Sequence, residues 1–220
     1  TGFEFIGISN RSAVIIDDSY NVEIYNNFFN KCGAFQFGKI VRITNGSSEN
    51  KIYNKDFNWT IIIPEGFETV EEKEWIAMQN KGANAIEDTF GEEIINHSKT
   101  IFVFKSGTVN YFESSFQPFD VAVDGDYIES CKAVNDILYE TFMAQMPGIT
   151  IERSNTTEKI DNLDFQVYKM KVIFPNKMEM YCMMFNRLFG KKELAVNIMY
   201  IDQSKGEKML ASWRASKFTK

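Results

Sequence analysis

Histidine is almost absent from this chain of 220 residues, which contains one, His97. Serine and cysteine triads need a histidine as their base, so a triad here would have to use His97. The surrounding Asn96-His97-Ser98 predicts a polar, solvated turn before a strand. Zinc sites built from two or three histidines are excluded by the count alone. The sequence therefore gives no support to histidine-centred catalysis.

Cysteine is scarce as well, with Cys32, Cys131 and Cys182 far apart in the chain. No two of them form a CxxC pair, which disfavours a zinc ribbon and a thioredoxin-like site. We expect buried thiols, with one disulfide and one free thiol as the alternative. The sequence also lacks the GxSxG nucleophile elbow, the phosphate-binding P-loop and the GxGxxG dinucleotide motif. We assign no catalytic residue and no cofactor from these patterns.

Long apolar runs and an excess of basic residues are missing too. The longest apolar-rich stretch, Met178 to Phe189, is interrupted by Glu179, Asn186 and Arg187, whereas a membrane helix needs about 20 apolar residues. The net charge is −6, and sequence-independent nucleic-acid binding relies on clustered Lys and Arg. We therefore expect neither an integral membrane segment nor a nucleic-acid partner. The chain begins at Thr1, so a cell-envelope location, with a signal removed before Thr1, and a cytoplasmic one both stay open.

Aromatic residues, in contrast, are abundant, at 15% of the chain with 20 Phe, which is enough to form one core. Residues 1–50 predict short β segments, which we interpret as a β-rich N-terminal extension packed on a main domain of residues 51–220. At the start of this domain, apolar residues alternate from Phe57 to Ile63 and stop at Pro64, which predicts a strand. The next expected elements are a helix over 71–88, strands over 100–105 and 109–116, and a long helix over 126–146 that ends at Pro147-Gly148.

Four strands in close succession are expected after the long helix. They cover residues 149–153, 163–174, 178–188 and 192–201. Turns this short favour antiparallel neighbours, because parallel strands need long crossovers. Ser204 and Glu207 then form a Ser-x-x-Glu capping box, which predicts a final helix that carries Leu210 and Trp213 and extends toward Phe218. This element order favours an α+β fold in which helices pack on one antiparallel sheet, a meander in its second half.

The same order of elements resembles the PsbP-like family, whose fold is shared with a small Ran-GTPase-binding protein. The resemblance covers residues 51–220 and is carried, besides the long helix, by "FNWTIIIPEGF" (57–67), "LDFQVYKMKVIF" (163–174), "ELAVNIMYID" (193–202) and "KMLASWRASKF" (208–218). It implies a PsbP-like α+β sandwich. It also implies a binding or accessory role rather than catalysis, and it transfers no functional residue to this chain.

Two groups of side chains are weighed as metal sites. Asp120, Asp124, Asp126 and Glu129 offer oxygens to a hard cation, but their order does not fit an EF-hand loop, and capping of the long helix explains the acids more simply. The second group shares one strand face and consists of Met178, Met180, Cys182 and Met184. Residues two apart on a strand are separated by about 6–7 Å, so these sulfurs cannot all reach one ion. We expect core packing, with a pliable Met-lined binding surface as the alternative, and assign no metal.

Aromatic residues on both faces of the strand over 109–119 are the remaining candidate. They are Tyr111, Phe112, Phe116 and Phe119. If one face of this strand is exposed, these side chains form a surface for a partner or ligand, whereas a covering helix would make them core.

The sequence as a whole predicts a non-catalytic protein that binds a partner protein or a ligand held in a groove. One alternative is a carboxylate-based hydrolase or lyase without histidine, which requires two converging acids, one with a raised pKa. The other is an immunity or inhibitor protein. The patterns do not specify an oligomeric state.

Overall fold

The main element of the fold is an antiparallel sheet, seen in a computed structural model that describes residues 41–42, 51–71, 74–76 and 98–219. In the described part of the chain its strands follow the order β4-β5-β6-β10-β9-β8-β7. They are β4 (Glu68–Thr69), β5 (Lys99–Lys105), β6 (Tyr111–Pro118), β7 (Thr150–Ile160), β8 (Leu163–Ile173), β9 (Glu179–Phe189) and β10 (Lys192–Tyr200). Every neighbouring pair is antiparallel. The predicted antiparallel meander is thereby confirmed.

A second, smaller sheet joins the two ends of the main domain. Its order is β1-β2-β3-β11. The strands are β1 (Val41–Arg42), β2 (Lys51–Asn54), β3 (Trp59–Ile62) and β11 (Lys217–Phe218). Phe218 therefore lies on a strand and pairs with Trp59, whereas the sequence predicted that the last helix extends toward it. The described part of the predicted N-terminal extension is β1, which pairs with β2.

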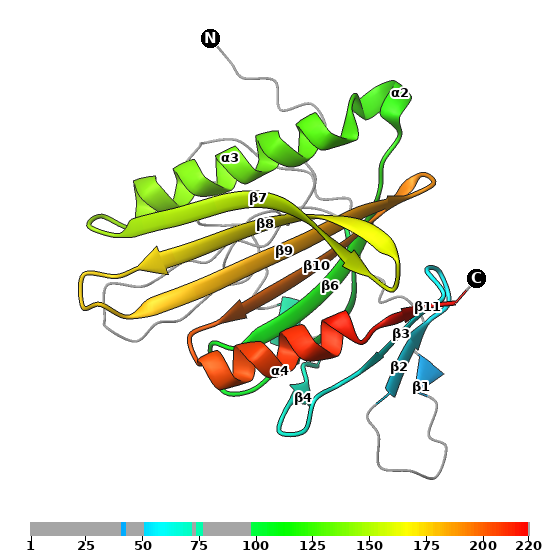
Figure 1. Ribbon diagram of the computed structural model, residues 1–220, viewed down its shortest axis with the longest axis horizontal. Coiled ribbons are helices and arrows are strands. Elements are labelled where there is room, and N and C mark those ends of the chain that lie inside the picture. The colour runs from blue at the N-terminus through cyan, green and yellow to red at the C-terminus, as the bar shows by residue number, and fades with distance from the viewer. Residues whose placement is uncertain (1–40, 43–50, 72–73, 77–97, 220) are drawn as a thin grey trace.

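Helices lie on both sides of the large sheet (Figure 1). The long helix α3 (Tyr127–Gln145), preceded by the short α2 (Val121–Asp124), runs along one face, and α4 (Gln203–Arg214) lies on the other side, next to the small sheet. The predicted long helix is confirmed to within a residue at each end. Its N-cap is Asp126, whose carboxylate accepts a hydrogen bond of 2.9 Å from the amide of Glu129, as expected for an acid at a helix N-terminus.

Helix α4 begins differently from the prediction. Its N-cap is Asp202, whose side chain accepts from the amide of Lys205 at 3.1 Å, so the helix starts one residue before Ser204 and the predicted Ser204–Glu207 capping box is wrong. Aspartate caps as well as serine does, and both residues fit the local pattern. Leu210 and Trp213 are buried on this helix as predicted.

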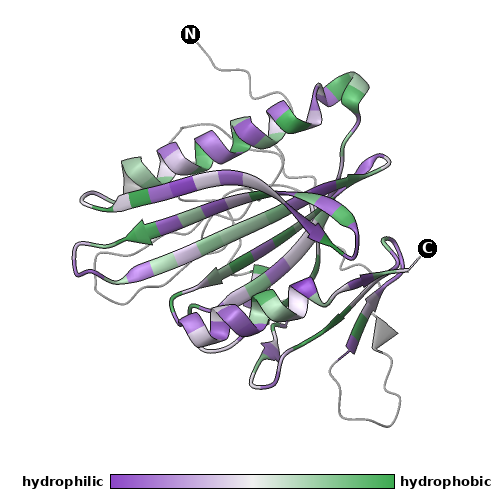
Figure 2. Ribbon diagram, in the orientation of Figure 1, coloured by the Kyte–Doolittle hydropathy of each residue, from purple (hydrophilic) through white to green (hydrophobic). Residues whose placement is uncertain are grey.

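Strand β7 is much longer than the predicted strand over 149–153. The connection to β8 is the two-residue turn Asp161-Asn162, with φ of 48° and 65°, and such a turn pairs its flanking strands directly. β7 therefore continues to Ile160. It is an edge strand, mostly hydrophilic and exposed (Figure 2). Its middle lacks the apolar alternation by which strands are recognised in a sequence.

Each face of the large sheet contributes to a separate apolar cluster. The cluster on the α4 side is rich in aromatic rings: Phe104 stacks on Phe112 with centroids 4.5 Å apart, and Trp213 meets Trp59 edge-on at 5.6 Å. The cluster on the α3 side contains Met180, Cys182 and Met184 from one face of β9. These three residues of the predicted sulfur stripe are therefore core, in agreement with the favoured interpretation.

Three predicted features fall outside the described residues or only partly within them. His97, Cys32 and most of the helix predicted over 71–88 lie outside, although residues 74–76 are helical. Trp75 in this piece is buried, and its indole nitrogen donates to the Thr100 hydroxyl at 3.2 Å.

Candidate ligand cleft beneath α3

Polar side chains form a belt across the face of the sheet that α3 covers. The strand register places Glu113 opposite Asn197, Ser115 opposite Ala195, and Gln117 opposite Glu193. Ala195 in turn is opposite Asn186, and Asn186 is opposite Gln166. The belt therefore crosses the strands β6, β10, β9 and β8. Most of it is buried, which is unusual for polar groups and requires hydrogen-bond partners.

Two carboxylates in this belt are each held by an amide. The Asn197 amide donates to Glu113 at 2.5 Å, and the Gln117 amide donates to Glu193 at 2.6 Å. Four residues along β6 separate the two pairs, a distance of about 13 Å. A glycosidase-like site needs carboxyl groups about 5–9.5 Å apart, and a pair that shares a proton needs them about 3 Å apart. Glu113 and Glu193 therefore do not form the converging pair that a carboxylate mechanism requires.

A cleft opens beside the belt, between α3 and strands β7 to β9, and encloses about 50 Å³ of free space. It is lined by Ile128, Cys131, Lys132 and Asn135 of α3, Asn155 and Thr156 of β7, Gln166, Val167 and Tyr168 of β8, and Asn186 of β9. Four of these side chains are carboxamides and none is a carboxylic acid. The lining offers hydrogen bonds but no acid or base for carboxylate chemistry.

Two polar atoms in the lining lack hydrogen-bond partners. They are the hydroxyl of Tyr168 and the side-chain oxygen of Asn186, in residues that are each 1% exposed. Burial raises the pKa of the Tyr168 hydroxyl, and the neighbouring Arg153 guanidinium opposes this shift as a donor and a positive charge facing the hydroxyl oxygen, so it is the O–H of Tyr168 that has no acceptor. A buried hydroxyl or amide oxygen without a partner costs about 1–3 kcal/mol. The cleft thus contains one unused acceptor and one unused hydroxyl, each kept away from bulk water.

The cations around the cleft are already paired with acids. Lys132 contacts Glu129 at 2.7 Å, and Arg153 contacts Asp136 at 2.6 Å. The Arg153 guanidinium also lies 3.8 Å from the centre of the Tyr139 ring. Because each positive charge has its own carboxylate, the cleft presents hydrogen-bonding groups without a free charge.

Besides the Arg153–Asp136 ion pair, a hydrogen bond between two carboxamides joins α3 to β7 at the cleft. The amide nitrogen of Asn135 on α3 donates to the side-chain oxygen of Asn155 on β7 at 2.8 Å. Cys131 and Cys182 are both buried and form no disulfide, which agrees with the expectation for these two cysteines. Burial raises the pKa of Cys182 to about 12, so its thiol stays protonated at neutral pH and is a poor nucleophile.

The four aromatic residues singled out in the sequence lie elsewhere and are not an exposed surface. Tyr111, Phe112 and Phe119 are 2%, 0% and 3% exposed, and Phe116 packs against the α4-side cluster. The physical reason is that β6 is a central strand with a packed layer on each face. These residues are therefore packed in the core, which is the alternative expected if the strand is covered, and a partner surface at this strand stays a prediction.

The acids considered for metal binding act in caps and ion pairs. Asp120 caps α2 and contacts Lys191 at 2.5 Å, and Asp124 accepts from the amide of Asp120 at 2.7 Å. The hydrogen bonds from Lys191 and from the amide of Ala122 lower the pKa of Asp120. In the described segments, no group of three or more His, Cys, Asp or Glu side chains is arranged to hold a metal ion.

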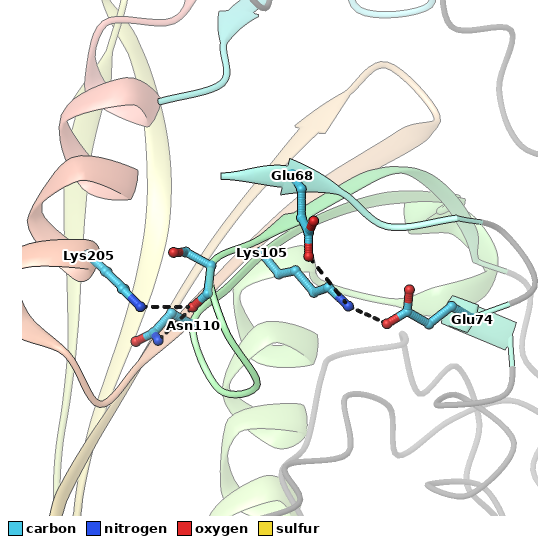
Figure 3. Close-up of polar contacts among 6 residues, drawn as sticks. Glu68, Glu74, Lys105, Asn110 and Lys205 are labelled. Carbon is cyan, nitrogen blue, oxygen red and sulfur yellow. Dashed lines mark hydrogen bonds and ion pairs between the residues drawn. The ribbon is translucent and has the colours of Figure 1, made fainter. Parts of the chain in front are cut away.

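A second polar cluster surrounds the β5–β6 hairpin (Figure 3). Lys105 forms ion pairs with Glu68 and Glu74, while Asn110 donates to the carbonyl of Ser106 at 2.9 Å. The Asn110 side-chain oxygen also accepts from the amides of Ile201 and Asp202 at 3.2 and 3.1 Å. Asn110 thereby fastens the hairpin to the start of α4. All of these groups use one another as partners, so the cluster is structural.

The sequence matches no protein-family model and no curated protein. Among solved structures it is similar to the solution structure of cyanobacterial PsbP (CyanoP) from Synechocystis sp. PCC 6803, with 9% identity over 86% of this chain and 98% of that chain and a TM-score of 0.48. The likeness concerns the arrangement of strands and helices, and no residue role follows from it. No helix among the described residues is long and apolar enough to span a membrane.

Proposed function

We propose that this chain is a non-catalytic binding protein that takes a small polar group of its ligand into the cleft beneath α3. The observation that carries the proposal is the pair of buried polar atoms without partners, the Tyr168 hydroxyl and the Asn186 side-chain oxygen. Both belong to residues that line the cleft. Native proteins satisfy nearly all buried polar atoms, and exceptions call for an explanation such as a ligand or an ordered water. A bound ligand group would supply both missing hydrogen bonds.

Access and flexibility also support a binding role. Ile128 and Lys132 at the edge of the cleft are exposed, so a ligand can enter without unfolding the domain. The apolar floor under the rest of α3 contains Met170, Met180 and Met184. Methionine is unbranched and adapts its shape to its neighbours, which would let the helix shift slightly when the cleft is filled.

A partner protein is the second candidate for the ligand, and a specific observation favours it. Val121, Val123 and Ile128 are 58%, 73% and 38% exposed on α2 and the first turn of α3. Ile128 also lines the cleft. A partner that places one side chain in the cleft would cover this apolar end of the helices, which matches the accessory role expected from the sequence.

The proposal is tested by ligand-observed saturation-transfer NMR with a mixture of small polyols, amides, carboxylates and amines. We expect at least one compound to receive magnetisation from the wild-type protein. Asn186→Leu, which removes the acceptor at nearly constant volume, should abolish that signal, while Lys208→Leu, an exposed change on α4, should retain it. The same compounds bound equally by both variants would show that the cleft is not the site.

A further inference from the structure

The cleft contains the parts needed to recognise one kind of uncharged group. Asn186 presents an oxygen that can only accept a hydrogen bond, and Tyr168 presents a hydroxyl that can donate one. The Arg153 guanidinium faces the hydroxyl oxygen of Tyr168, which leaves the O–H to donate. A ligand group that pairs with both residues therefore carries a donor and an acceptor close together. A carboxylate lacks the donor, and an ammonium group lacks the acceptor.

The charged residues around the cleft also favour an uncharged ligand. Lys132 and Arg153, the cations at the cleft, are bound to Glu129 and Asp136, so an anionic ligand would compete with carboxylates already in place. Among the described residues, no Asp or Glu lines the cleft to attract a cation. Burying an unpaired charge is far more costly than burying a neutral polar group. The geometry and the electrostatics both favour an uncharged ligand.

Size narrows the choice among uncharged groups. The cleft has about 50 Å³ of free space, and one water needs roughly 10–15 Å³ on this measure. The space therefore corresponds to roughly three to five water-sized groups. A single hydroxyl would fill only part of it. A primary carboxamide with its attached carbon has four non-hydrogen atoms, in the right range.

From these observations we propose that the cleft binds a primary carboxamide, whose NH₂ donates to the Asn186 oxygen and whose carbonyl accepts from the Tyr168 hydroxyl. The existing bond between Asn135 and Asn155 is the same kind of amide–amide contact. The aliphatic carbon of the ligand would face Ile128. This inference rests on the proposed function, because it names the ligand chemistry of the same cleft. The carboxamide has two possible sources, a small free amide or the side chain of a Gln or Asn in a partner protein.

The test is a set of matched probes titrated into the full ¹⁵N-labelled chain and followed by its ¹H–¹⁵N spectrum. The probes are propionamide, sodium propionate, 1-propanol and N,N-dimethylpropionamide, which share a short apolar body and differ in hydrogen bonding. We expect propionamide to shift saturably the signals of Asn135, Asn155, Tyr168 and Asn186. Asn186→Leu and Tyr168→Phe should each weaken its binding at least tenfold, and Lys208→Leu should not.

The outcomes separate the ligand chemistry from the site. If propionate or propanol shifts the same signals at lower concentration than propionamide, the cleft binds ligands but the carboxamide assignment is wrong. If no probe shifts these signals, the carboxamide assignment fails, and the broader NMR screen described above then decides the function of the cleft. Peptides Ac-Gly-Gln-Gly-NHMe and Ac-Gly-Glu-Gly-NHMe distinguish the source: a Gln peptide that binds more tightly than propionamide indicates a protein partner, and a weaker one indicates a small amide.

Discussion

The amide of Asn135 on α3 donates a hydrogen bond of 2.8 Å to the side chain of Asn155 on β7, and this contact closes one side of the cleft. Asn155 is otherwise exposed on an edge strand. We therefore expect Asn155→Ala to loosen the N-terminal half of α3 with a loss of global stability of about 0.5–1.5 kcal/mol. Hydrogen–deuterium exchange should become faster in residues 127–136 and remain unchanged in α4. Thr157→Ala, two residues along the same strand, is the control. Equal exchange in both variants would mean that the contact does not hold the helix.

The stack of Phe102, Phe104 and Phe112 identifies β6 as a core strand and gives a second prediction. Phe112 is fully buried, so Phe112→Ala leaves a cavity and should lower the free energy of unfolding by about 3–5 kcal/mol. Val123→Ala, at a residue 73% exposed, should change it by less than about 0.5 kcal/mol. Urea denaturation measures both. A small loss for Phe112→Ala would restore the hypothesis of an aromatic surface.

Helix α4 approaches the sheet closely at Gly206, where a methyl group would lie 2.4 Å from ring carbons of Tyr200. Gly206→Ala should therefore destabilise the protein by about 1–3 kcal/mol, although alanine favours helices by about 1 kcal/mol. In a Tyr200→Leu background the ring is gone, and the same substitution should become neutral or stabilising. Thermal denaturation of the four proteins tests this, and an unchanged loss in the Leu background would rule out the ring as its cause.

Asp161 couples the β7–β8 turn to the C-terminal strand and predicts a dependence on pH. Its pKa is lowered by the hydrogen bond from the Phe218 amide and by Lys217. A carboxyl group whose folded pKa is depressed stabilises the fold above its unfolded pKa, and this contribution disappears as the pH falls through the folded value. Asn tolerates the positive φ of this position, so Asp161→Asn should keep the turn.

We expect Asp161→Asn to lower the melting temperature at neutral pH and to approach wild type as the pH falls through the lowered pKa of Asp161. High salt should also reduce the difference, because Lys217, the charged partner of Asp161, is exposed to solvent. Glu65→Gln, an exposed acid outside this hairpin, should show no such convergence. A constant difference between Asp161→Asn and wild type at all pH values would point to the turn conformation and not to the charge.

Much of the fold follows from local sequence patterns. The strands β8, β9 and β10 and the helix α3 were predicted within one or two residues, because each combines a clear apolar period with a turn or breaker such as Pro147-Gly148. The middle of β7, with its hydrophilic residues from Ser154 to Glu158, could not be predicted this way. It is a strand because the Asp161-Asn162 turn pairs it with β8.

The cleft was not predicted from the sequence. Its side chains come from α3, β7, β8 and β9, and nothing local indicates that they meet. One signal was present: Asn186 interrupts the apolar-rich stretch from Met178 to Phe189, and a polar residue on a buried central strand marks a place where a partner is needed. The aromatic residues of β6 allowed two interpretations. Aromatic side chains on both faces of a strand are expected for an exposed binding surface and equally for a strand between two packed layers.

The division at residue 50 stays a prediction, and deletion of residues 1–45 tests it. We expect the remaining domain to fold and to bind its partner less tightly. Loss of folding would assign the deleted residues to the core.

The most direct test of the binding role is the stability of Tyr168→Phe in the absence of any ligand. If the hydroxyl is kept for a ligand, removing it should leave the free energy of unfolding unchanged or raise it by about 1 kcal/mol, because an unpaired buried group is lost. Tyr127→Phe is the matched control. Its hydroxyl donates to Glu193 at 3.1 Å, so its loss should cost about 1.5–3 kcal/mol. A comparable loss in Tyr168→Phe would show that the hydroxyl already has a structural partner and would contradict the account.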